Sequence, residues 1–228
     1  MCFKYHKYDL LRFRPLLNIY YLILYVVPNL NVEDFIPVIV NSLDGKSMTI
    51  SIESVFEAIN ALGKRPFIVV ITSTGLIEAR NRGFEKLKEV FKVDKMRGIL
   101  LDSDVLIYPE SFLYEEMKKS MEENYGITSG YVSTYNLVNV VNPETDRLMS
   151  IEEYAKIPNM TEIKKSGLGF YFGEFPLNYH FQCTKEAGED IAFFNYVSEN
   201  IHPVKLAKKI HLGHMKYLAL NIPDYGDA

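Results

Sequence analysis

The stretch Gly98-Ile99-Leu100-Leu101-Asp102-Ser103-Asp104 decides the fold, because a short apolar run ends directly in two carboxylates separated by one small residue. Such a brief, unbroken run predicts a strand buried on both faces of a mostly parallel sheet. Ligands bind beyond the carboxyl ends of these strands, which is where Asp102 and Asp104 emerge. Two carboxylates this close repel each other, and Mg2+ or Mn2+ is the usual compensation. The alternative is a turn whose aspartates only cap the next segment.

Strands and helices alternate before this stretch. Apolar strand-like runs occupy residues 35–40 and 67–72, and apolar residues at helical spacing follow them over residues 50–62 and 79–91. Parallel strands joined by right-handed helical crossovers give this alternation. We therefore predict an α/β fold with an open, twisted, mostly parallel sheet flanked by helices.

The second half of the chain has weaker patterns. Helical spacing returns over residues 113–121 and 189–200, a glycine-punctuated strand is expected over residues 126–133, and residues 167–175 alternate like a hairpin strand. Residues 142–166 are polar and longer than an ordinary connection, which predicts a flexible lid or substrate loop. A short surface helix near residues 151–156 is the alternative.

Composition limits the classes of function. The chain has 228 residues, 48% of them hydrophobic, so it can bury a full core. Its 25 basic and 29 acidic residues give a net charge of -4, which argues against nucleic acid as a partner. Cys2 and Cys183 are the only cysteines, so a disulfide framework is not expected and a reducing, cytoplasmic location is the default. Cys183 is expected in the core.

Residues 1–34 form a basic and apolar extension before the main domain, which we assign to residues 35–221 with a tail over residues 222–228. The apolar run over residues 16–27 is too short to span a bilayer. Packing onto the domain, contact in a homo-oligomer and peripheral membrane contact through residues 1–28 all stay open.

Two further clusters carry candidate chemistry. Glu189 and Asp190 begin the late helix, where they either cap it or supply a general base. His211 and His214 flank Leu-Gly and are candidate third ligands beside a carboxylate pair. Earlier in the chain, Arg80 stands near a helix N-terminus and offers a guanidinium fork to a diphosphate.

The order of these pieces resembles a known family. An Ala-Arg-Asn-x-Gly helix (residues 79–83), an apolar strand into Asp-Ser-Asp, a Gly-Glu-Asp helix and a His-Leu-Gly segment follow one another over residues 36–215. This order is similar to that of nucleotide-sugar-dependent glycosyltransferases of GT-A fold, especially the mostly inverting family two. The chain has Val105 where that family often has a further aspartate.

The resemblance implies roles for individual residues. Asp102 would approach the ribose or a metal-bound water, and Asp104 would coordinate Mn2+ or Mg2+ bridging the diphosphate. Asp190 would be the catalytic base, with Glu189 orienting the acceptor or the base, and His211 would complete the metal shell or hold the diphosphate. The implied nucleotide-sugar-binding residues are Asn41, Thr72, Arg80, Asn81, Asp102 and Ser103.

The resulting expectation is a metal-dependent, hexosyltransferase-type enzyme. It would move a sugar from a nucleoside diphosphate sugar to a hydroxyl of a glycan, lipid-linked or protein acceptor, with inversion. Two alternatives stay open. One is a haloacid-dehalogenase-like phosphatase in which Asp102 is phosphorylated, although that family places its motif on the first strand. The other is a catalytically silent GT-A-like binding module.

Overall fold

The computed structural model describes residues 31–41, 48–71, 76–108, 111–132, 136–183 and 188–214. Contacts divide the chain into a first unit, Met1–Val32, and a second unit, Glu33–Ala228. Most of the predicted extension, residues 1–34, and the whole predicted tail, residues 222–228, lie outside the described residues. All described strands and α-helices belong to the second unit.

The first half of the sheet consists of parallel strands joined by helices, as predicted. The strand Phe35–Asn41 pairs with the strand Arg65–Ile71 on one side and with the strand Lys95–Asp102 on the other. The register sets Asn41 opposite both Ile71 and Asp102. The carboxyl ends of all three strands therefore lie together. The elements are the short 3-10 helix η2 (Val32–Asp34), β1 (Phe35–Asn41), α2 (Met48–Ala61), β2 (Arg65–Ile71), α3 (Leu76–Phe91) and β3 (Lys95–Asp102).

The sheet continues through β9 (Phe170–Pro176), which runs antiparallel to β3 on one side and to β5 (Gly126–Thr128) on the other. Beyond β5 lie β10 (Val204–Leu206), parallel to β5, and the short antiparallel edge strand β8 (Thr161–Glu162). The complete seven-stranded order is β2-β1-β3-β9-β5-β10-β8. Because β9 pairs with a strand on each edge, it is a central strand rather than the expected hairpin strand, and its aromatic side chains are buried.

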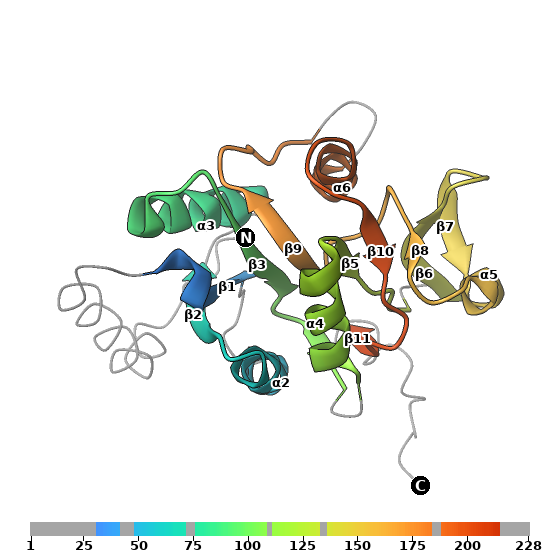
Figure 1. The fold of residues 1–228 in the computed structure, drawn as a ribbon. Coiled ribbons are helices and arrows are strands. Elements are labelled where there is room, and N and C mark those ends of the chain that lie inside the picture. The colour runs from blue at the N-terminus through green and yellow to red at the C-terminus, as the bar shows by residue number, and fades with distance from the viewer. Residues whose placement is uncertain are drawn as a thin grey trace, which may run out of the picture. The chain divides into compact units, whose positions relative to one another are not determined.

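Helices cover both faces of this sheet. In Figure 1, α3 and α6 (Glu189–Asn200) lie on one side, and α2 and α4 (Leu113–Glu123) lie on the other. Ile99 of β3 and Phe172 of β9 are fully buried between the layers. The predicted α/β class, a mostly parallel sheet flanked by helices, is confirmed.

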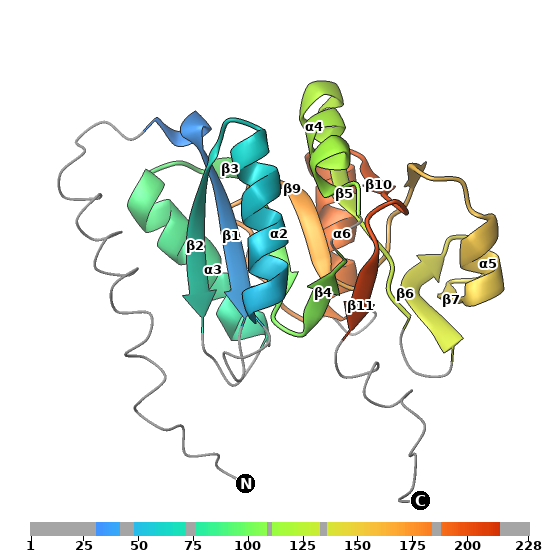
Figure 2. The same ribbon diagram turned by 90° about the horizontal axis from the view of Figure 1, so that it is seen from below.

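Residues 142–166 contain regular structure where an irregular loop was expected, and the alternative, a short helix near residues 151–156, is present. β6 (Leu137–Asn142) pairs with β7 (Arg147–Ser150), and α5 (Ile151–Lys156) follows directly. Ser150 and Glu153 form a reciprocal capping box that starts α5. The polar composition arises because the turn over residues 143–146, most of β7 and α5, which Figure 2 shows at the edge of the domain, are exposed or half-buried.

A second small sheet positions the end of β3. β4 (Val105–Ile107) follows the Asp-Ser-Asp turn and pairs with β11 (Leu212–His214), with His214 opposite Val105. This pairing brings the C-terminal end of the described chain back to the turn. Within the described ranges, none of the helices has both the length and the apolar character needed to cross a membrane.

Candidate functional site

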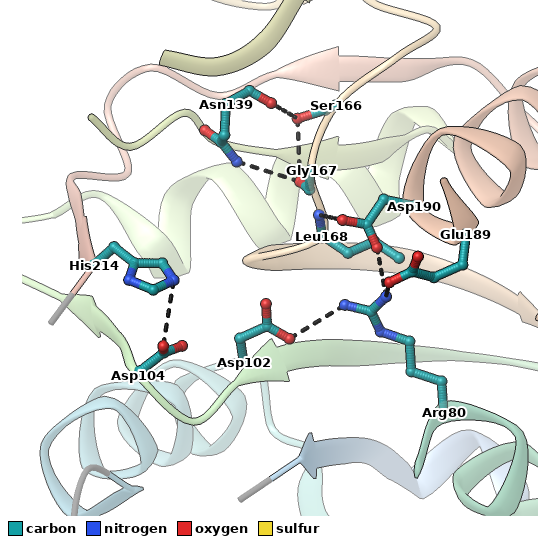
Figure 3. Close-up of polar contacts among 10 residues, drawn as sticks. All are labelled: Arg80, Asp102, Asp104, Asn139, Ser166, Gly167, Leu168, Glu189, Asp190 and His214. Atoms are coloured by element: carbon teal, nitrogen blue, oxygen red, sulfur yellow. Dashed lines mark hydrogen bonds and ion pairs between the residues drawn. The ribbon is translucent and has the colours of Figure 1, made fainter. Parts of the chain in front are cut away.

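Arg80 is the centre of the candidate site and is contributed by α3. Its side chain is only 3% exposed, and Nη1 donates to Glu189 Oε1 at 3.1 Å and to Asp190 Oδ1. Nη2 donates to Asp102 Oδ1 at 3.3 Å (Figure 3). Burial alone would lower the pKa of Arg80, but attraction by the three carboxylates raises it above its ordinary value. One firmly charged guanidinium therefore faces three acidic side chains.

Glu189 and Asp190 open α6, as the sequence predicts. Gly188 occupies the N-cap position, and no side-chain hydrogen bond caps this helix. Asp190 Oδ2 instead accepts a hydrogen bond from the backbone N–H of Leu168 at 3.2 Å. Cys183 is exposed, in contrast to the expected core position, and its Sγ lies 3.7 Å from Glu189 Oε2. Glu189 and Asp190 thus do more than begin α6, because both side chains contact residues outside the helix.

Asp102 ends β3 with its backbone and its side chain both engaged. Its N–H donates to the carbonyl of Gly169 at 3.1 Å, which ties the strand end to the segment before β9. Burial raises the pKa of Asp102, Arg80 partly reverses this rise, and the charges of Asp190 and Asp104 add to it, so that the pKa is about 6. Desolvation and like charge thus outweigh the ion pair with Arg80.

Asp104 lies on the other side of the turn and contacts a histidine. His214 Nε2 is 3.4 Å from Asp104 Oδ2, and the imidazole packs against Tyr131 at 4.9 Å between ring centroids. The sequence prediction had favoured His211, but that side chain is exposed and its residue precedes β11. The register of β11 against β4 explains the difference, since it sets His214 opposite Val105, the residue after Asp104.

The remaining predicted nucleotide-binding residues, Asn41, Thr72, Ser103 and Asn81, do not form one group of contacts in the described part of the chain. Asn41 ends β1 next to Asp102 in the sheet, and Thr72 lies outside the described residues. Ser103 is buried in the turn. Asn81 donates through Nδ2 to the carbonyl of Phe181 at 3.0 Å and accepts from the N–H of the same residue at 2.7 Å. Its amide therefore holds the segment before α6.

The candidate ligands of a divalent cation are the two aspartates of the turn. Asp102 and Asp104 supply hard oxygen ligands, which suit Mg2+ or Mn2+. In the part of the chain that the structure describes, no group of three or more His, Cys, Asp or Glu side chains is arranged to hold a metal. Mg2+ commonly takes only one or two protein carboxylates and completes its shell with substrate phosphates and water. The two aspartates match the number and the chemical type of ligands in that mode of binding.

The sequence did not predict the part played by the segment before β9. Ser166 and Gly167 are bonded to Asn139 of β6, and the next residue, Leu168, donates to Asp190 (Figure 3). The glycines of this segment were a signal of close backbone approach. A backbone N–H leaves no other trace in a sequence, so its carboxylate partner could not be identified.

Comparisons with known proteins found no matching family model and no match among curated proteins. The solved structures that match this chain include the following two. One is A197 from STIV, with a TM-score of 0.48, 15% identity and coverage of 79% of this chain and 84% of that chain. The other is a glycosyltransferase involved in the glycosylation of the major capsid of PBCV-1, with a TM-score of 0.44, 10% identity and coverage of 79% and 93%.

Proposed function

We propose that the protein is a metal-dependent glycosyltransferase that moves a sugar from a nucleoside diphosphate sugar to an acceptor hydroxyl with inversion. The observation that carries the proposal is the meeting of Asp102, from the end of β3, with Glu189 and Asp190, from the start of α6, around Arg80. Acids from two distant segments thereby gather at the carboxyl end of a parallel strand, where α/β folds bind their ligands.

Asp190 is the proposed general base. Its two oxygens accept hydrogen bonds from Arg80 and from the N–H of Leu168, which fixes the plane of the carboxylate. Each oxygen keeps a further lone pair for an acceptor hydroxyl. In the proposed step the hydroxyl oxygen bonds to the anomeric carbon, the bond to the diphosphate breaks, and the hydroxyl proton passes to Asp190. A single in-line displacement of this kind inverts the anomeric centre.

Asp102 and Asp104 are the proposed protein ligands of Mn2+ or Mg2+. The side chain of Asp104 is 39% exposed, so it is open to a ligand from solvent, and His214 lies beside it. When bound there, a divalent cation supplies Lewis-acid stabilisation of the departing diphosphate.

A panel of nucleoside diphosphate sugars that differ in base and sugar tests the class of reaction. Release of nucleoside diphosphate is measured with Mn2+, with Mg2+ and with EDTA. We expect release with one donor type, supported by Mn2+ or Mg2+ and abolished by EDTA. Hydrolysis of an aryl phosphate without dependence on a nucleotide sugar contradicts the proposal and supports the phosphatase. Absence of turnover together with no thermal stabilisation by nucleoside diphosphate and Mn2+ supports a silent module.

Substitution of Asp190 tests the role of the base. We expect Asp190→Asn to lower kcat by about 100-fold or more, because general base catalysis is commonly worth that much. Glu199→Gln is the matched control, since Glu199 is an exposed acid on the same helix. If the Asp190 variant keeps more than about a tenth of the wild-type kcat, the assignment of the base is wrong.

A further inference from the structure

We infer that Arg80 is a positioning residue, which fixes the carboxylate of Asp190 for proton acceptance and joins it to the Asp102 end of β3. The inference rests on the proposed function, because Asp190 acts as a base only if the transfer takes place. It differs from the sequence prediction, in which the guanidinium binds the diphosphate of the donor.

The geometry of the guanidinium group is the first argument. Nη1 is shared between Glu189 Oε1 and Asp190 Oδ1, while Nη2 reaches Asp102 Oδ1. A planar fork can direct separate N–H groups at carboxylates on two different elements, whereas the ammonium of a lysine is a single compact charge. The side chain is thus bonded within the protein on both sides, and it links α6 to the end of β3.

A second link between the same two acids runs through the main chain. Leu168 donates its N–H to Asp190 Oδ2 at 3.2 Å, and the next residue, Gly169, accepts the N–H of Asp102 at 3.1 Å. Asp190 is therefore held through one oxygen by Arg80 and through the other by Leu168. Removal of the guanidinium leaves a single described hydrogen bond to orient the carboxylate.

The position of Arg80 does not depend on the carboxylates alone. Its guanidinium carbon lies 5.9 Å from the centroid of the Phe181 ring, and Asn81, the next residue on α3, bonds both backbone groups of Phe181. Arg80 itself belongs to the buried face of α3, together with Ala79 and Phe84. The guanidinium is thus a preorganised donor on a rigid element, which is what an orienting group needs.

A loss of activity alone does not separate this role from simple structural support, because three carboxylates are left facing one another when the guanidinium is removed. The backbone N–H of Leu168 offers a more direct measurement. Its acceptor is the carboxylate whose orientation is at issue. The N–H of Gly167, in the same segment, donates to the Asn139 carbonyl at 2.8 Å and serves as an internal reference.

The experiment measures amide hydrogen exchange by NMR together with the kinetics of the best donor in the wild type, Arg80→Met and Arg80→Lys. Arg82→Gln is the matched control, because Arg82 is 59% exposed on the same helix and pairs with Glu78. We expect at least tenfold faster exchange of the Leu168 amide in Arg80→Met, with the Gly167 amide unchanged. We also expect kcat to fall at least tenfold, with KM for the donor changed less than threefold. Arg80→Lys keeps the positive charge and therefore serves as the test variant if Arg80→Met does not fold. It should also show faster exchange at Leu168.

The outcomes separate the inference from the proposed function. If Leu168 exchange is unchanged in both variants, or if kcat is unchanged while the wild type is active, Arg80 does not position Asp190. If exchange rises at Leu168 alone and kcat falls, the inference is supported. If the wild type turns over no donor while exchange still rises at Leu168 alone, glycosyl transfer fails as the function, but the hold of Arg80 on Asp190 is supported.

Discussion

Asp102 and Asp104 stand two residues apart in one turn, yet their surroundings differ. The side chain of Asp102 is 18% exposed and lies against the buried Arg80, whereas that of Asp104 is 39% exposed and lies beside His214. The first aspartate is tied to the cluster that holds the proposed base, and the second is more open to solvent. The pair is therefore not a symmetric chelate, and its two members should fail in different ways when they are substituted.

The largest expected effect is on turnover when Asp104 is substituted. Asp104→Asn removes a charged, accessible ligand of the proposed cation and leaves the Arg80 cluster in place. We expect kcat/KM for the donor to fall by about 100-fold or more, on the scale at which charge stabilisation in a transition state is lost. The measurement is nucleoside diphosphate release over a titration of Mn2+, in which higher Mn2+ should recover part of the loss.

Asp94→Asn is the matched control for this variant. Asp94 stands just before β3, at the opposite end of the strand, where it pairs with Lys88. It should retain turnover within about twofold, as expected of an exposed substitution away from the site. Equal losses in the two variants would show that Asp104 has no particular role in the reaction.

The next effect concerns stability, and it should arise at Asp102 alone. The pKa of Asp102 in the folded protein is about 6, above the ordinary value of 3.8, so the folded state binds this proton more tightly than the unfolded state. The stabilising contribution is complete below about pH 4 and is lost as the pH rises to about 6. In EDTA above pH 7, the free energy of unfolding of Asp102→Asn should therefore be about 3 kcal/mol higher than that of the wild type, which corresponds to a rise in Tm of roughly 6–12 °C.

Urea denaturation at pH 4 and at pH 7.5 measures this difference. The advantage of Asp102→Asn should be present at the higher pH and absent at the lower one, while its turnover is strongly reduced. Asp104→Asn is the comparison, and its stability should stay within about 0.5 kcal/mol of the wild type at both values. A destabilised Asp102 variant at pH 7.5 would mean that the ion pair with Arg80 outweighs the desolvation of the carboxylate.

The same contrast between regions appears in how well the sequence predicts the fold. The alternation from β1 to β3 is visible because each element is long enough to show its period, and the helices α4 and α6 are equally clear. The strands β4, β10 and β11 have three residues each and β8 has two, which is too short for any period to appear. β5 covers only the first three residues of the strand predicted over residues 126–133. Their pairing depends on contacts between distant segments, which local pattern does not contain.

The site divides in a similar way. The sequence predicts Asp102, Asp104, Glu189 and Asp190 as candidates from local pattern, and the structure brings three of them, Asp102, Glu189 and Asp190, together around Arg80. It did not identify the link through Arg80, whose partners are 22 to 110 residues away along the chain. Cys183 was expected in the core, but it is exposed beside Glu189. Distances in space between such segments follow from the sheet order and not from composition.

The smallest expected effect separates the two histidines near the C-terminal end of the described chain. His214→Gln removes the ring that lies 3.4 Å from Asp104 Oδ2, while Asp102 and the Arg80 cluster stay as they are. A neighbour that orients a metal-binding carboxylate typically contributes about tenfold or more to metal affinity. We expect the Mn2+ concentration for half-maximal turnover to rise about tenfold, with kcat at saturating Mn2+ close to that of the wild type.

His211→Gln is the control and should change neither quantity, because that side chain is exposed and its residue precedes β11. The reverse result, a loss of Mn2+ affinity in His211→Gln alone, would support the assignment that the sequence favoured and would mean that the chain rearranges around the bound cation.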